Sequence, residues 1–89
     1  MYTVYILKSL IKERYYIGCT VDLDRRLKEH NTGMTKSTKA YKPWEIIHEE
    51  YIPSSSEAFK REKEIKSYKG NSKFKQLILE RWQSPRKAG

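Results

Sequence analysis

The chain alternates short hydrophobic runs with charged stretches, and the apolar spacing changes from strand-like to helix-like along its length. Residues 3–8 and 15–19 are rich in β-branched and aromatic side chains, which is typical of strands. Because the gap between them is short, we expect an antiparallel hairpin, although the gap lacks an Asn-Gly or Asp-Gly pair that would fix the turn type. Residues 44–52 form a third such run, and Pro53 closes it.

A first helix is predicted after the hairpin, over residues 21–30. Thr20 is a plausible N-cap for this helix, because a hydroxyl can accept a hydrogen bond from a backbone N–H of the first turn. Leu23 and Leu27 are four residues apart and therefore share one face. Residues 31–33 (Asn-Thr-Gly) are expected to end the helix.

Two further helices are predicted in the C-terminal half. Ser54 and Glu57 form a capping box for a helix that ends near Lys66. Asn71 or Ser72 is expected to cap a last helix. The apolar positions of that helix repeat at helical spacing and are expected to lie in the core: Phe74, Leu77, Ile78 and Trp82.

The resulting element order is β-β-α-β-α-α, and residues 34–43, which show no clear periodicity, are expected to form a loop. The simplest packing for this order is an α+β fold, with a three-stranded antiparallel sheet flanked by helices. A chain of 89 residues leaves room for one domain. We place this domain at residues 1–82 and a polar tail at residues 83–89.

The charge of the chain points to a polyanionic partner. It carries 19 Lys and Arg against 11 Asp and Glu, a net charge of +8 with a pI of about 9.6. Nucleic acid is therefore the first partner to consider, and an anionic membrane the second. No apolar stretch approaches the roughly 20 residues that span a bilayer, and the N-terminus does not resemble a signal peptide. We expect no membrane contact, and we expect Lys36, Lys39 and Lys42 to steer phosphates.

The low cysteine content narrows the possible chemistry. Cys19 is the only cysteine, so no internal disulfide can form, and a reduced, cytoplasmic setting fits best. With only His30 and His48 besides, a structural zinc site is not expected. Cys19 is expected to be a small buried apolar residue. His48 is expected to be an ordinary polar position on the third strand.

Five polar or aromatic residues stand out as a candidate constellation. In a hairpin with a short turn, Tyr5 and Tyr16 can lie nearly opposite each other. Arg26 and His30 are four residues apart and share a helix face. Glu62 falls among apolar positions of the second helix. Each residue alone has an ordinary interpretation, as a strand aromatic or a solvated charge, so their order along the chain carries the signal.

The spacing of these residues resembles the GIY-YIG nuclease family. The matching segments are Thr-Val-Tyr at 3–5, Tyr-Ile-Gly at 16–18, the helix segment 22–30 and Arg-Glu-Lys-Glu-Ile-Lys at 61–66. The chain is most similar to small stand-alone bacterial members, related to the N-terminal nuclease module of the excision-repair nuclease. Thr3 stands where the name-giving glycine would be.

The resemblance implies a metal-dependent endonuclease that hydrolyses DNA phosphodiester bonds, in DNA repair or recombination. Glu62 would hold one Mg²⁺ or Mn²⁺, since hard cations bind carboxylate oxygen and keep several waters. Arg26 would stabilise charge developing on the scissile phosphate. Tyr16 or Tyr5 would deprotonate the attacking water. A free phenol has a pKa near ~10, so the metal, Arg26 and His30 would have to assist.

Some assignments within the resemblance stay open. Tyr16 is the preferred base of the two tyrosines, and Glu62 is preferred over Glu64 because of its register with the Ile-Lys pair. Gly18 would let substrate approach the backbone, and Asn71 is better explained as a helix cap than as a site residue.

The DNA bound would be branched or recognised without sequence specificity. The alternative function is a nucleic-acid-binding module or an interaction subunit of a repair complex with the same fold and little catalysis.

Overall fold

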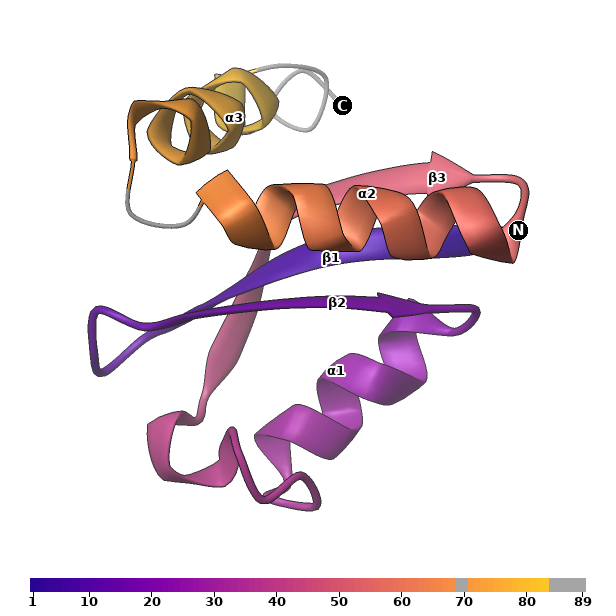
Figure 1. Ribbon diagram of the computed structural model, residues 1–89. Helices are drawn as coiled ribbons and strands as arrows, with labels where there is room; N and C mark the ends of the chain where they lie inside the picture. Colours follow the sequence, from indigo (N-terminus) through magenta and orange to yellow (C-terminus); the bar gives the residue numbers. More distant parts are fainter. Residues whose placement is uncertain (69–70, 84–89) are drawn as a thin grey trace.

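The computed structural model describes residues 1–68 and 71–83, with side chains of the last segment as far as Ile78 (Figure 1). The predicted order of elements is confirmed, with one added turn of 3₁₀ helix, η1. The elements are β1 Tyr2–Ser9, β2 Tyr15–Thr20, α1 Leu23–Asn31, η1 Lys39–Tyr41, β3 Trp44–Ile52, α2 Ser55–Tyr68 and α3 Ser72–Gln83.

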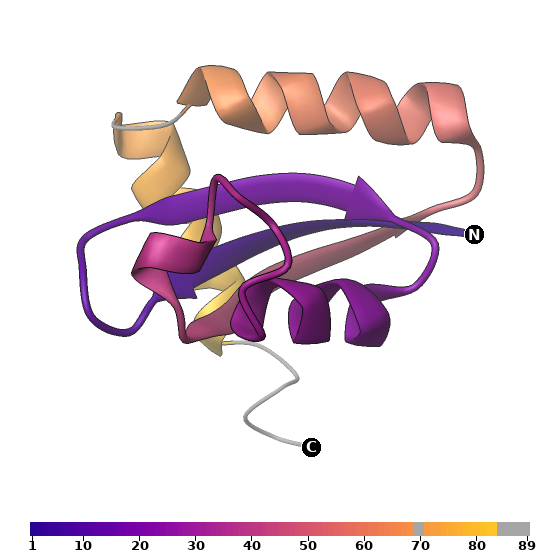
Figure 2. The ribbon, with the colours of Figure 1, turned by 90° about the horizontal axis from the view of Figure 1, so that it is seen from below.

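The three strands form one antiparallel sheet in the order β2-β1-β3. Helices α2 and α3 cover one face of the sheet, and α1 lies against the other (Figures 1 and 2). The predicted α+β fold with a three-stranded antiparallel sheet is therefore confirmed. None of the helices in the described part of the chain has both the length and the apolar character needed to cross a bilayer.

The central strand β1 is buried on both faces, which explains its nearly continuous hydrophobic sequence. Because side chains alternate along a strand, Val4 and Ile6 face α2 while Tyr5 and Leu7 face α1. The core under α2 and α3 contains Val4, Ile6, Ile17, Ile47, Ala58, Ile65 and Phe74. The core over α1 contains Tyr5, Leu7 and Trp44, with Tyr16, Leu23, Leu27, Tyr41 and Ile46 partly buried around it.

Helix α1 begins two residues later than predicted, at Leu23, because Thr20 still belongs to β2. Asp22 is the N-cap, and its side chain accepts a hydrogen bond from the Arg25 backbone N–H at 3.1 Å. The Thr20 hydroxyl instead accepts from the Asp22 N–H, also at 3.1 Å. The two side chains together make a tight turn from strand to helix, which fixes the position of α1 against β2.

The segment predicted as a loop, residues 34–43, is fastened to its neighbours and includes η1. The side-chain oxygen of Asn31 accepts from the Trp44 backbone N–H, and the Asn31 amide donates to the Trp44 carbonyl at 3.1 Å. The Trp44 indole N–H donates to the Thr38 carbonyl at 3.0 Å. These bonds tie the end of α1 to the start of β3, so the loop is held over the α1 face of the sheet.

Both predicted caps of the C-terminal helices are present. The Ser54 hydroxyl accepts from the Glu57 N–H at 3.3 Å, and α2 extends to Tyr68, slightly beyond the predicted end. The side chain of Asn71 accepts from the Phe74 N–H at 3.2 Å, which makes Asn71 the cap of α3. The helix-cap interpretation of Asn71 is therefore the correct one.

The predicted core face of α3 is confirmed as far as it is described. Phe74 is buried, and Leu77 and Ile78 are partly buried against the same core. The side chain of Trp82 and residues 84–89 of the predicted polar tail lie outside the described residues.

Candidate active site

The two tyrosines of the constellation lie on the α1 face of the sheet, but they are diagonal neighbours and not directly opposite. Tyr5 pairs with Gly18 across the hairpin, and Tyr16 pairs with Leu7. The ring centroids of Tyr5 and Tyr16 are 6.3 Å apart. The expected proximity of the two side chains is confirmed, with an offset of two residues because the length of the turn sets the pairing.

Gly18 provides the space in which the Tyr5 ring lies. A Cβ built on Gly18 would lie 2.5 Å from the Tyr5 hydroxyl oxygen and 2.7 Å from the ring carbon that bears it. Any side chain at this position would therefore displace Tyr5. The structure thus gives Gly18 a packing role, in addition to the expected role in substrate approach, which stays a prediction.

His30 lies at the centre of the cluster and is fully buried. Its Nε2 is 3.4 Å from the Tyr5 hydroxyl, its Nδ1 is 2.8 Å from the Thr38 hydroxyl, and its ring centroid is 4.7 Å from that of Tyr16. The Thr38 hydroxyl donates to the Thr35 carbonyl at 3.4 Å, so it accepts from Nδ1–H of His30. This assignment leaves Nε2 free to accept the proton of Tyr5.

Thr38 is a site residue that the sequence did not reveal. It is 2% exposed, and it fixes both the orientation and the tautomer of His30. No periodic pattern marks it, because it comes from the irregular segment after α1. Burial, and the nearby positive charge of Arg26, lower the pKa of His30, so the imidazole is neutral at neutral pH.

Arg26 projects from α1 toward Tyr5, and the carboxylate of Glu29 fixes its orientation. Its guanidinium interacts with the Tyr5 hydroxyl, which raises the pKa of Arg26. One guanidinium nitrogen donates to a Glu29 oxygen at 2.8 Å, while Arg25 bonds the other Glu29 oxygen at 2.6 Å. Glu29, a second residue that the sequence analysis missed, therefore orients Arg26. Its three-residue spacing from Arg26 on a helix is the signal that could have identified it.

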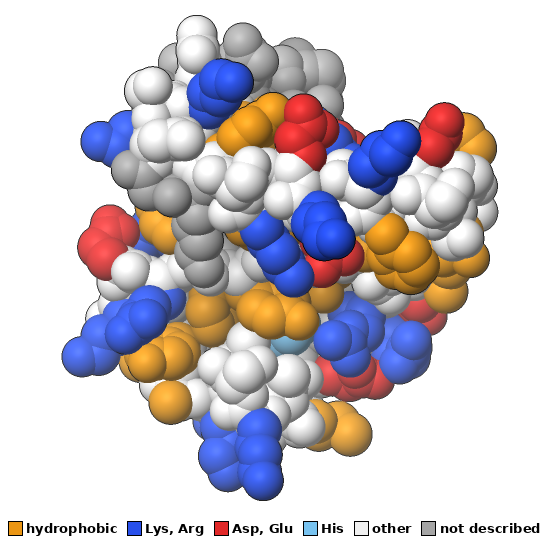
Figure 3. All heavy atoms as spheres, viewed as in Figure 1, with side chains coloured by type: hydrophobic (Ala, Val, Ile, Leu, Met, Phe, Trp, Pro, Cys, Tyr) orange, Lys and Arg blue, Asp and Glu red, His pale blue; other side chains and the backbone are white. Residues whose placement is uncertain are grey.

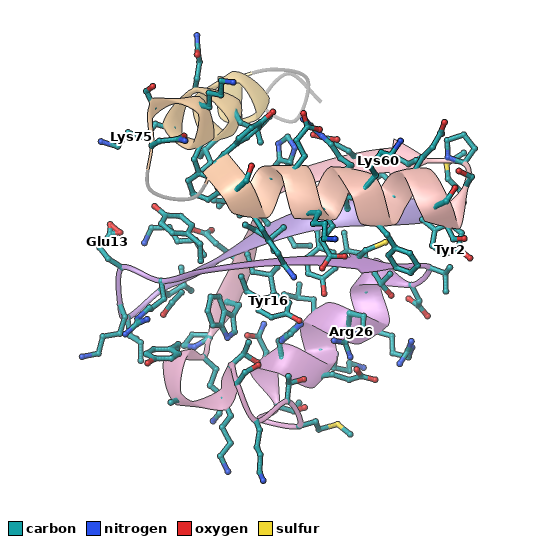
Figure 4. All side chains as sticks on the ribbon, in the orientation of Figure 1. Tyr2, Glu13, Tyr16, Arg26, Lys60 and Lys75 are labelled. Carbon is teal, nitrogen blue, oxygen red and sulfur yellow. The ribbon has the colours of Figure 1, made fainter. Side chains whose placement is uncertain are left out.

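The environment of Tyr5 favours its neutral form. Burial raises the pKa of Tyr5, the interaction with Arg26 opposes this effect, and the charges of Tyr16 and Glu62 add to it. Tyr5 is therefore protonated at neutral pH and is able to donate to His30. In Figure 4, Tyr16 and Arg26 lie on the same side of β2, between that strand and α1.

Glu62 comes from α2, on the other side of the sheet, yet its charge acts on the cluster. Burial is the main cause that raises the pKa of Tyr5 and of Cys19, and the Glu62 carboxylate adds to it in both. Because β2 is an edge strand, a side chain from α2 can reach the cluster around this edge. The Glu62 side chain is 21% exposed and pairs with the Lys66 ammonium at 2.8 Å.

Of the two acidic residues in this motif, Glu62 is the one whose charge adds to the effect of burial on the pKa of Tyr5. Glu64 instead bonds Arg61 at 3.0 Å and the Tyr68 hydroxyl at 2.8 Å. The described residues contain no group of three or more His, Cys, Asp or Glu that could hold a metal ion. A single carboxylate suits a hard cation such as Mg²⁺, which keeps most of its waters. The donors present therefore fit one Mg²⁺ or Mn²⁺ at Glu62.

A pocket of about 290 Å³ opens beside Tyr16. It is lined by Glu13, Arg14, Tyr15, Tyr16, Ser37, Thr38, Tyr41 and Trp44. The three loop lysines expected to steer phosphates, Lys36, Lys39 and Lys42, are exposed, and none of them lines this pocket. Lys39 and Lys42 lie near Gly33 at the end of α1. Their expected contact with nucleic acid stays a prediction.

Two other residues differ from expectation. Cys19 is only partly buried, because it lies on the edge strand beside α2. His48 is 1% exposed and bonds Glu50 at 2.6 Å, and Glu50 in turn bonds Arg61 of α2 at 2.7 and 2.9 Å. This network lies on the α2 face of the sheet. It joins β3 to the helix that carries Glu62.

Comparison with known proteins identifies the family of this chain. A UPF0213 protein of Syntrophus aciditrophicus is 42% identical over 77 residues, which cover 84% of this chain and 86% of that protein. A UPF0213 protein of Staphylococcus aureus is 39% identical over 79 residues, covering 88% and 94%. The solution NMR structure of the UPF0213 protein BH0048 from Bacillus halodurans is 31% identical with a TM-score of 0.53, covering 97% of this chain and 90% of that one. The sequence model of the GIY-YIG catalytic domain matches residues 1–76, and the chain belongs to this family of nucleases.

Proposed function

We propose that this protein is an endonuclease that hydrolyses phosphodiester bonds in DNA with the help of one Mg²⁺ or Mn²⁺. The observation that carries the proposal is the convergence of two tyrosines, a buried histidine and an arginine on one sheet face. Tyr5, Tyr16, His30 and Arg26 form this cluster. The negative charge of Glu62 acts on the same place from the neighbouring helix.

Each member of the cluster has a role that suits its environment. Tyr16 would accept the proton of the attacking water, and Tyr5 would stay protonated and donate to neutral His30. Arg26, already aimed by Glu29, would bind the scissile phosphate, because a guanidinium matches two phosphate oxygens. Glu62 would hold the metal ion, which supplies positive charge to the phosphate and lowers the pKa of bound water.

The charge of the chain supports a nucleic-acid substrate. A net charge of +8 on 89 residues favours the binding of a polyanion. This electrostatic attraction to the phosphates does not depend on the base sequence of the nucleic acid. Lys36, Lys39 and Lys42 would add to this attraction from the loop. We therefore propose that the protein acts in the cytoplasm on branched DNA, or on DNA without sequence preference, in repair or recombination.

A cleavage assay tests the proposal. Purified protein is incubated with branched and linear DNA in Mg²⁺, in Mn²⁺ or in EDTA, and products are resolved on a denaturing gel. We expect metal-dependent cleavage by the wild type that Arg26→Ala or Glu62→Ala abolishes. Arg25→Ala is the matched control, because Arg25 shares the Glu29 carboxylate but is more exposed. Equal cleavage by wild type and the two site variants contradicts the proposal.

The same experiment distinguishes the proposed nuclease from the alternative, a protein that binds nucleic acid without cleaving it. The ion pair between Glu62 and Lys66 leaves the candidate metal ligand already bound to a cation, which would suit a protein that binds nucleic acid without cutting it. Salt-dependent binding with no product in either metal would support that alternative.

A further inference from the structure

A second pocket lies on the outer face of α2, directly beside Glu62. Its volume is about 390 Å³, and it is lined by Ser56, Phe59, Lys60, Glu62, Lys63 and Lys66. All six residues belong to one helix, and none is among its buried residues, Ala58 and Ile65. The fold therefore does not need these side chains for packing, and the surface they form is open to a ligand.

In the part of the chain that the structure describes, two of the four charges on this surface are unpaired, and both are positive. Within the described residues, Lys60 and Lys63 have no ion pair, and only Lys66 is neutralised, by Glu62. Figure 3 shows basic side chains over α2 and beside α1 on the same face of the molecule. A polyanion that lies along this face would meet both groups of charges (Figure 3).

An aromatic ring interrupts the charged surface. Phe59 is 58% exposed and stands next to Lys60 on the helix. A nucleic-acid strand offers apolar sugar and base surfaces between its phosphates, on which an exposed phenylalanine can pack. Lysine beside an aromatic ring is thus the composition that contacts both parts of a strand.

We propose that the outer face of α2, formed by Phe59, Lys60 and Lys63, binds the strand of nucleic acid that leads away from the cleaved phosphate. The position of that phosphate rests on the proposed function. Lys60 and Lys63 bind phosphates, and Phe59 packs on the sugar or base between them. Residues 59–63 rise about 6 Å along the helix, the length of about two nucleotides of one strand.

Binding without cleavage tests this surface. Fluorescence anisotropy with a labelled short branched DNA in EDTA gives the dissociation constant at several salt concentrations. We expect the double variant Lys60→Gln/Lys63→Gln to bind several-fold more weakly. For this variant, the slope of the logarithm of the binding constant against the logarithm of the salt concentration should be about 2 smaller in magnitude. Each lost phosphate contact contributes about 0.9 to that slope. The matched control Lys73→Gln/Lys75→Gln removes the same charge from α3, where Figure 4 shows Lys75 far from Arg26.

A variant of Phe59 distinguishes a specific apolar contact from general electrostatic attraction. Phe59→Ser should weaken binding several-fold and leave the salt slope unchanged, because the contact it removes is not ionic. Thermal melting checks that each variant is folded. If the α2 variants bind like the α3 control, or if the wild type does not bind DNA, the inference is wrong. If binding depends on α2 but no cleavage occurs in metal, the inference stands and the proposed nuclease function fails.

Discussion

The hydroxyl of Tyr5 lies over the backbone of Gly18, only 2.5 Å from where a Cβ of that residue would be. The two residues are cross-strand partners in the hairpin. The glycine of the Tyr-Ile-Gly segment is therefore tied to the tyrosine of the first strand by packing. Because Tyr5 also contacts His30 and Arg26, the position of this ring sets the geometry of the whole cluster.

Gly18→Ala should displace Tyr5 and disturb both stability and activity. Overpacking of this kind costs about 1–3 kcal/mol of unfolding free energy. We expect a lower melting temperature and at least a tenfold loss of DNA cleavage. A double-mutant cycle with Tyr5→Ala is the control, because in that background the added methyl group no longer meets the Tyr5 ring and its nearest neighbour is Tyr16, at 3.0 Å. An equal cost of Gly18→Ala in both backgrounds would show that the close approach is unimportant.

The strands, the helices and the caps of α2 and α3 could be predicted because they depend on local signals, whereas the cap of α1 is Asp22 and not the predicted Thr20. The β-branched and aromatic run of β1 and the side-chain caps at Ser54 and Asn71 are all visible in the sequence. The candidate site was found through its resemblance to a family, since Tyr5, Tyr16 and Glu62 are far apart in the chain. Single-residue patterns alone would not have joined them.

The features that sequence analysis missed depend on tertiary contacts. Thr38 reaches His30 only because the loop after α1 is fastened by Trp44. His48 was taken for an ordinary polar position, but a register shift in the pairing of β1 with β3 places Ile47 and His48 in succession among the buried residues. No strict alternation predicts two successive buried positions, so the burial of His48 could not be expected.

Thr38→Val should release His30 without emptying the space beside it. The variant keeps the shape of the side chain but removes the acceptor of Nδ1–H, and an unsatisfied buried donor costs about 1–3 kcal/mol. We expect lower stability, reduced cleavage and a changed ¹⁵N shift of His30 Nδ1. Thr32→Val is the control, because Thr32 is exposed. An unchanged Nδ1 resonance would contradict the assigned hydrogen bond.

The Glu50 network should make stability depend on pH in acid. Although burial opposes ionisation, hydrogen bonds from His48 and Arg61 lower the pKa of Glu50 from 4.5 to about 2. A carboxyl whose pKa is lower in the folded state stabilises the protein above its unfolded pKa, and this contribution is lost as the pH falls from about 4.5 to about 2. This difference between the folded and unfolded pKa of Glu50 corresponds to about 3 kcal/mol of unfolding free energy at neutral pH.

Urea unfolding of wild type and Glu50→Gln from neutral to acid pH tests this network. The variant should be less stable than the wild type near neutral pH. The difference between their free energies of unfolding should disappear as the pH approaches 2. Glu13→Gln is the control, since the Glu13 side chain is 80% exposed. A gap that stays constant across the acid range would show that the charge of Glu50 does not matter to folding.

Lys66 should compete with the metal ion for Glu62. The Lys66 ammonium lies 2.8 Å from the Glu62 carboxylate, so a cation that binds there must weaken this pair. Exposed pairs contribute up to about 1 kcal/mol, which corresponds to about a fivefold change in affinity. We therefore expect Lys66→Gln to bind Mn²⁺ up to about fivefold more tightly, as measured by electron paramagnetic resonance in the absence of DNA. Lys63→Gln removes the same charge without breaking the pair, and equal effects of the two variants would mean that general electrostatics, and not direct competition, governs the metal.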